Sequence, residues 1–143
     1  YIRRVEIPST VTNLGAWAFA GCTALQSVSL ASTIGEISDG LFYRDNHEEC
    51  SGIETVVIPA SVKRIGKYAF ASNTRLTEIE LPESVEEIDD YAFYRCTVLT
   101  NVVIKGKLKR VGEAAFWGCE KLKRPELPSS VEIGEEAFGG WIP

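Results

Sequence analysis

Apolar residues recur along this chain at an interval of about 23 residues. Phenylalanine occupies Phe19, Phe42, Phe70, Phe93, Phe116 and Phe138, with successive gaps of 23, 28, 23, 23 and 22 residues. A second apolar column keeps the same step at Leu25, Ile53, Leu76, Leu99 and Leu122. A period of this length indicates stacked repeats, in which each unit is too small to bury its own apolar face.

Each copy ends in a segment that alternates apolar and polar residues, which is typical of a half-buried strand. In residues 76–81 the apolar Leu76, Ile79 and Leu81 are expected to point inward, while Glu78 and Glu80 point outward. The equivalent segments are Ile2–Ile7, Leu25–Leu30, Ile53–Ile58, Leu76–Leu81, Leu99–Ile104 and Leu122–Leu127. One strand per repeat predicts that these segments stack in parallel as a single sheet.

The rest of each copy is expected to form the return path of the coil. A proline opens it in several copies, and a glycine such as Gly66 permits a tight bend. The Ala-Phe pair that follows, for example Ala69-Phe70, is predicted to lie on one short helical turn. There the small alanine allows close packing between coils, and the phenylalanine fills the interior.

The full motif, I-G-x-x-A-F-x-x-C-x-x-L-x-x-V-x-I, recurs at Leu14–Leu30, Ile65–Leu81, Ile88–Ile104 and Val111–Leu127. It resembles the BspA-like, or Treponema pallidum-type, class of leucine-rich repeats. The fold that the resemblance implies is an α/β right-handed solenoid, with one parallel β-sheet and short helical or turn segments on the opposite face. The pattern is broken by Ser38 and Asp89 in the glycine position, by Leu41 in the alanine position and by Pro125 in the strand valine position. These departures are expected to alter local geometry only.

We therefore interpret residues 1–143 as one leucine-rich repeat domain of about six repeats of ~23 residues. The chain contains no methionine, and neither end shows the polar cap that a solenoid needs, so we read it as a fragment of a longer repeat array. A formal net charge of −5 argues against nucleic acid or an anionic membrane as the main partner. No apolar run has the length of a membrane span, and no signal peptide opens the sequence.

The cysteines share one position of the repeat. Each lies three residues before the strand's first Leu or Ile, at Cys22, Cys50, Cys96 and Cys119, and Asn73 takes this place in the remaining copy. Equivalent positions in stacked coils point inward along one line, which predicts buried, unbridged thiols and not a disulfide framework. The only histidine, His47, lies in the five-residue insertion of the second repeat. We interpret this insertion as an exposed loop and do not expect a metal site there.

Catalytic motifs are absent from the sequence, which contains no G-x-S-x-G, P-loop, H-E-x-x-H or C-x-x-C pattern. Neither an enzyme nor a cofactor is predicted. The remaining candidates for function are surface residues, because solenoids present their outward strand positions as an extended binding face. The candidate binding residues are Thr55, Val57, Glu78, Glu80, Asn101 and Val103. Val57 and Val103 are apolar at positions where solvent would favour polar side chains.

A second set of surface candidates flanks the phenylalanine column. It comprises Trp17, Tyr68 and Tyr91, two residues before the phenylalanine, and Tyr43, Tyr94 and Trp117 just after it. Exposed aromatic side chains are typical interface anchors. They can equally serve as lids that pack over the coil interior, and the sequence leaves both interpretations open.

The resemblance also implies a biological setting. BspA-like repeats belong to bacterial and protozoan surface or secreted proteins that bind host proteins or other cells. The function this implies is a cell-surface or secreted protein-binding or adhesion module, whose partner is a host extracellular protein or a protein on another cell's surface. The alternative is a passive structural spacer within a larger surface protein.

Overall fold

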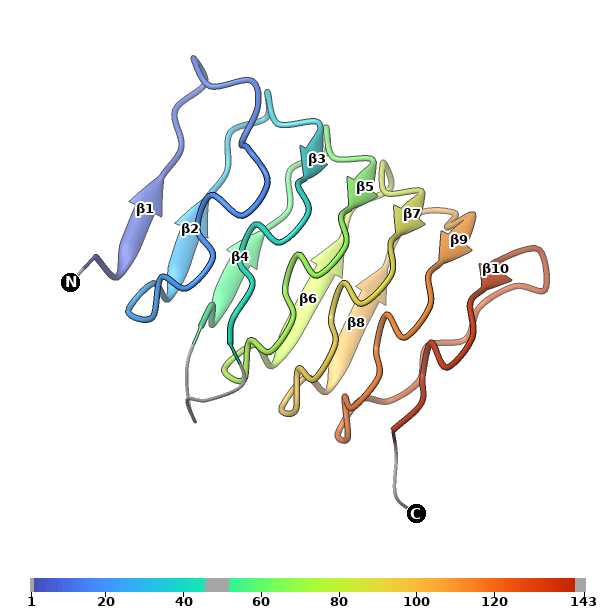
Figure 1. Cartoon of the computed structure of the whole chain (residues 1–143). Helices are drawn as coiled ribbons and strands as arrows, with labels where there is room; N and C mark the ends of the chain where they lie inside the picture. The colour runs from blue at the N-terminus through green and yellow to red at the C-terminus, as the bar shows by residue number, and fades with distance from the viewer. Residues whose placement is uncertain (1, 46–51, 141–143) are drawn as a thin grey trace.

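The chain winds into a solenoid of parallel strands whose coils lie side by side (Figure 1). This computed structural model describes residues 2–45 and 52–140. Its strands are β1 (Arg4–Glu6), β2 (Ser27–Ser29), β3 (Glu36–Ile37), β4 (Thr55–Val57), β5 (Arg64–Ile65), β6 (Glu78–Leu81), β7 (Glu87–Ile88), β8 (Asn101–Ile104), β9 (Arg110–Val111) and β10 (Glu132–Ile133). Those residues contain no helix.

One face of the solenoid is a ribbon made of β1, β2, β4, β6 and β8, each within a segment that the sequence predicts as a strand (Figure 1). β1, β2 and β4 pair in parallel, and β6 pairs with β8 in register, with Glu78 opposite Asn101 and Glu80 opposite Val103. The ladder pairing is interrupted between β4 and β6. The sixth predicted strand, Leu122–Leu127, is wrong, since no strand forms there. Pro125 lies in its middle and has no N–H to donate to a ladder.

A second parallel sheet runs along the solenoid, in the order β10-β9-β7-β5-β3. Each of its strands has two residues, and β3, β5, β7 and β9 each follow the turn after a ribbon strand. In the central strands the second residue is buried, as at Ile65 and Ile88, while the first is only partly buried. The prediction of a single sheet is therefore wrong. These short segments also alternate between inward and outward residues and face their equivalents in the next coil, so they form a ladder of their own.

The predicted helical turn at the Ala-Phe pair is also wrong, because consecutive β-turns occupy this segment. Ala69 N–H donates to Gly66 C=O at 3.2 Å, and Asn73 N–H donates to Phe70 C=O at 3.2 Å. Tyr68 and Ser72 have φ angles of 58° and 60°, outside the right-handed helical region. Alternate N–H groups point along the solenoid axis, as in the 2.8 Å bond from Phe70 N–H to Ala92 C=O of the next coil.

The core lies between the ribbon and these turns. The six phenylalanine rings form one stack through all the coils, with centroid separations between 5.0 Å and 5.9 Å. The rings of Phe70, Phe93 and Phe116 are fully buried, while the terminal Phe19 and Phe138 are partly covered. The prediction that this column fills the interior is confirmed.

The cysteine column is partly as predicted. Cys96 and Cys119 are buried and unbridged, and their thiols donate to the carbonyls of Phe70 and Phe93 in the preceding coil at 3.1 Å and 3.0 Å. Burial raises the pKa of the Cys96 thiol and keeps it protonated. Cys22 is free but exposed, which contradicts the prediction of burial, because among the described residues its coil packs against another coil on one side only. Cys50 and His47 lie outside the described residues.

Candidate binding site

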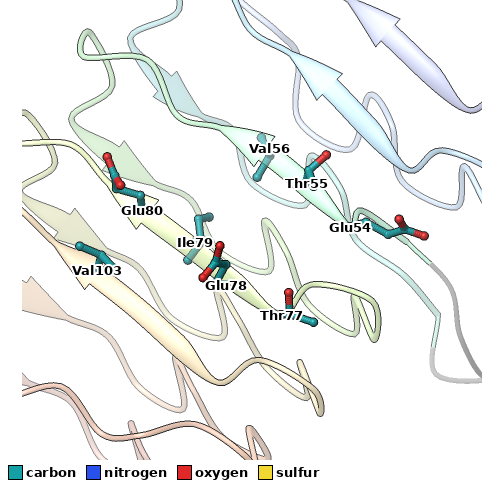
Figure 2. Close-up of a pocket in the computed structure, with 8 residues that line it drawn as sticks. All are labelled: Glu54, Thr55, Val56, Thr77, Glu78, Ile79, Glu80 and Val103. Atoms are coloured by element: carbon teal, nitrogen blue, oxygen red, sulfur yellow. The ribbon is translucent and has the colours of Figure 1, made fainter.

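A groove opens on the outward face of the ribbon, at the place where the ladder is interrupted between β4 and β6 (Figure 2). Its volume is about 280 Å³. The groove is lined by Glu54, Thr55, Val56, Thr77, Glu78, Ile79, Glu80 and Val103. The backbone edges of two neighbouring strands therefore face the groove without pairing to each other as a ladder.

Strand alternation decides which side chains meet solvent in this groove. Thr55, Glu78 and Glu80 are exposed, whereas Ile79 between the two glutamates is buried in the core. Val56 is partly buried and packs against the same core. Val103 adds an apolar wall from β8 and keeps 38% of its surface exposed. The groove thus has hydroxyl and carboxylate groups at its rim and one exposed apolar side chain, Val103, at its wall, while the side chains of Val56 and Ile79 face the core.

Three carboxylates set the electrostatics of the groove. Glu54 pairs with Arg75 at 2.6 Å, and Glu80 pairs with Lys105 at 2.7 Å. The hydrogen bond and charge of Glu80 raise the pKa of Lys105, which stays protonated. Within the described residues Glu78 takes part in no ion pair. It is the carboxylate that can accept a hydrogen bond or a cation from a partner without breaking an existing pair.

The groove lies at the junction between the 28-residue second copy and the regular third copy. Asn73, which takes the cysteine position, bridges this junction on the core side. Its Oδ1 accepts from Ile53 N–H at 2.8 Å, and its Nδ2 donates to Phe42 C=O at 2.8 Å. A Cβ added at Gly52 would lie 2.3 Å from this Oδ1, so a glycine is needed beside it. The interior of the junction is tightly connected, although the ribbon above it is not.

The structure gathers part of the predicted set in one place. Thr55, Glu78, Glu80 and Val103 line the groove. Val57 and Asn101 lie on the same ribbon but are not among the lining residues, and Val57 is 77% exposed beside Ser29 of β2.

Sequence reasoning missed the other half of the lining: Glu54, Val56, Thr77 and Ile79. Outward alternation cannot select them, because two are core-facing and two precede the strands. The signals that mark this junction are the insertion of the second copy and Asn73 in a cysteine column.

The groove is not arranged as a metal centre. In residues 2–45 and 52–140, no group of three or more histidine, cysteine, aspartate or glutamate side chains is close enough to hold a metal ion. What the groove can do chemically is recognise a partner through apolar contact, hydroxyl groups and a carboxylate.

Comparisons with known proteins identify the family of this chain. The profile of BspA type leucine-rich repeat regions matches residues 1–51 and 45–141, in six copies. The chain therefore belongs to the BspA-type leucine-rich repeat family. Leucine-rich repeat domains are generally protein-interaction modules and are typically not enzymes. Residues 2–45 and 52–140 contain no helix that is long and apolar enough to cross a membrane.

Solved structures share this fold. A leucine-rich repeat protein from Bacteroides ovatus is 25% identical, with a TM-score of 0.80, over 98% of this chain and 41% of its own. The T. pallidum leucine-rich repeat protein is 30% identical, with a TM-score of 0.70, over 96% of this chain and 76% of its own. A leucine-rich cell surface protein from Faecalibacterium prausnitzii is 20% identical, with a TM-score of 0.66, over 94% of this chain and 32% of its own. The comparison with curated proteins gives no match.

Proposed function

We propose that this chain is a protein-binding, adhesive module of a cell-surface or secreted protein, and that its ligand contacts the outward ribbon at the groove between β4 and β6. The observation that carries this proposal is the groove itself, which lies where the ribbon ladder is interrupted and combines the exposed apolar side chain of Val103 with the carboxylate of Glu78, which takes part in no ion pair among the described residues. The wider contact surface is formed by Thr55, Val57, Glu78, Glu80, Asn101 and Val103.

Two further observations support a protein ligand over a passive spacer. Val57 and Val103 expose 77% and 38% of their surface on the same ribbon, so a protein ligand that covers the groove could also bury apolar surface beside it. The Faecalibacterium prausnitzii protein of the same fold is described as a cell surface protein, which supports the proposed location. A spacer would need the solenoid to be rigid but would not need a groove.

The test is binding of the 143-residue chain to a panel of immobilised extracellular-matrix proteins, measured by biolayer interferometry. The double variant Val57→Asp/Val103→Asp should weaken binding to any panel member at least about tenfold. The matched control is Ser129→Asp/Ser130→Asp, which adds the same charge at exposed turn positions away from the ribbon and should leave binding unchanged. If no panel protein binds, or if both variants bind like the parent, the spacer becomes the better account.

A further inference from the structure

The second sheet ends in an open edge at β10 (Figure 1). β10 pairs with β9 on one side, and Ile133 keeps 41% of its surface exposed, whereas the equivalent Ile65 and Ile88 are fully buried. The other edge of the sheet is covered by the first coil, where Leu14 C=O accepts a hydrogen bond from the Ser38 hydroxyl. A hollow of about 360 Å³ reaches Ile133 and is lined by Arg124, Pro125, Glu126, Leu127 and Ile133.

The backbone of the last coil is open on the same side. Between interior coils, Gly112 N–H donates to Ile88 C=O at 2.8 Å, and Phe93 N–H donates to the C=O of the next coil at 2.7 Å. The equivalent groups, Ile133 C=O and Phe138 N–H, have no backbone partner among the described residues. A polypeptide that supplies both donors and acceptors can therefore extend this edge.

Acidic and basic strands alternate along the second sheet. The acidic strands share the sequence pattern Glu-Ile-x-Asp/Glu, at residues 36–39, 87–90 and 132–135. The basic strands between them are followed by glycine, as Arg-Ile-Gly at 64–66 and Arg-Val-Gly at 110–112. Across the sheet, the residues that face one another in register are Glu36, Arg64, Glu87, Arg110 and Glu132.

Two of the three acidic patterns hold an arginine from the next coil. Arg64 pairs with Glu36 at 3.3 Å and with Asp39 at 2.7 Å, so it bridges the first and last residues of the pattern. Arg110 reaches the last residue of the second pattern, Asp90, at 2.7 Å. An acidic pattern of this chain is thus a site for the arginine of a following strand.

The third acidic pattern has the same spacing and holds no arginine. Glu132 and Glu135 stand in the places of Glu36 and Asp39, and both are exposed. Within residues 2–45 and 52–140, neither carboxylate forms an ion pair. The open edge therefore combines unpaired backbone groups with two acidic side chains in the arrangement that binds Arg64.

The interior also shows why glycine follows the basic strands. Asp39 Oδ1 accepts a hydrogen bond from Lys67 N–H at 2.9 Å. A Cβ added at Gly66 would lie 2.6 Å from this oxygen, so a side chain there would push the carboxylate away. A strand that adds to an acidic pattern is thus expected to carry arginine, then an apolar residue, then glycine.

We propose that the open edge of β10 binds a partner polypeptide through an Arg-(Ile/Val)-Gly segment, which adds as a parallel strand. Its arginine pairs with Glu132 and Glu135, and its apolar residue covers Ile133. A second folded copy of this chain does not supply the segment, because its own segments at 64–66 and 110–112 are paired on both sides. The edge belongs to a different sheet from the groove, so its ligand is independent of the one that binds the ribbon.

The test uses the intact 143-residue chain and a fluorescein-labelled peptide with the sequence of residues 61–72, which contains Arg64-Ile65-Gly66. Fluorescence anisotropy follows binding, and the expected dissociation constant is about 1 mM or tighter. The variant Glu132→Gln/Glu135→Gln removes both charges at nearly constant size and should weaken binding at least about threefold. The matched control Glu6→Gln/Glu83→Gln removes two exposed carboxylates from other coils and should bind like the parent.

Two altered peptides test the recognised segment itself. The peptide with Arg64→Glu should bind at least about fivefold more weakly, and so should the peptide with Gly66→Leu. The proposal is overturned if the parent peptide does not bind, if both altered peptides bind as tightly as it does, or if Glu132→Gln/Glu135→Gln leaves its affinity unchanged. Sedimentation velocity tests a second copy as the occupant. Self-association of the chain that Glu132→Gln/Glu135→Gln abolishes would assign the edge to that copy and also overturn the proposal.

Discussion

The core side and the ribbon side of this solenoid respond differently to the same irregular repeat. On the core side the phenylalanine stack passes from Phe42 to Phe70 at 5.3 Å, like the stacks between regular copies. The short sheet likewise pairs β3 with β5 directly, with Glu36 opposite Arg64 across a step of 28 residues. On the ribbon side the ladder is interrupted between β4 and β6, and the groove lies there. Stacking in the interior therefore holds the coils in register, and the ribbon is free to diverge.

The largest expected effect comes from the interior. Phe93→Ala should lower the free energy of unfolding by about 3–5 kcal/mol, because it removes a fully buried ring from between two stacked neighbours. Urea unfolding followed by circular dichroism measures it. Val57→Ala on the ribbon is the control and should change stability by less than about 0.5 kcal/mol. Similar losses in both variants would contradict the idea that the interior alone sets the register.

Asn73 tests the core side of the irregular junction. Asn73→Ala should cost at least about 2 kcal/mol, because it leaves the buried Ile53 N–H and Phe42 C=O without this partner. Asn73→Cys should cost about 1 kcal/mol less than alanine, since a thiol there can donate to Phe42 C=O as Cys96 does to Phe70 C=O. Urea unfolding of the two variants compares them directly. Equal losses would mean that the asparagine acts by its size and not by its hydrogen bonds.

A smaller effect is expected at the outer side of the second sheet. Asp89 keeps only 9% of its side chain exposed and accepts from Arg64 at 2.8 Å and from Arg110 at 3.0 Å. Burial alone would raise its pKa, but the Asp90 N–H and the two guanidinium groups outweigh burial and lower it. Asp89→Asn should therefore cost about 1–2 kcal/mol at neutral pH.

The pH dependence of that cost has a definite sign. A carboxylate whose pKa is lowered by folding stabilises the protein above its unfolded pKa, and this contribution is lost as pH falls through the folded pKa. The stability difference between the parent and Asp89→Asn should therefore shrink below about pH 4. Urea unfolding across this range measures it. A difference that stays constant down to the acid limit would show that packing, not charge, makes Asp89 stabilising.

The sequence was a good guide wherever side-chain identity alone decides the structure. The phenylalanine and leucine columns, five of the strand segments and the buried Cys96 and Cys119 were predicted correctly from their period. The turns were not, because their left-handed positions are occupied by Tyr68 and Ser72, and nothing in those residue types signals a positive φ. The second sheet was missed because two-residue strands leave too short an alternation to detect.

The candidate site was only half predictable for a related reason. Outward alternation identifies Thr55, Glu78, Glu80 and Val103 as surface residues, since it depends on each strand alone. The groove depends on whether two strands pair, which is a relation between neighbouring copies. The break between β4 and β6 lies at the junction of two copies of different length, and no single repeat contains that information.

The N–H groups of the turns donate to the next coil, as in the bonds from Phe70 to Ala92 and from Phe93 to Ala115. These bonds lie along the solenoid axis, so a stretching force applied to the two ends would act on them directly. We expect the bonds of one coil to break before those of the next. A coil that peels away would release about 80 Å of extended chain, given about 23 residues at 3.3–3.6 Å each. The solenoid would therefore lengthen in regular steps under tension while its remaining coils stay folded.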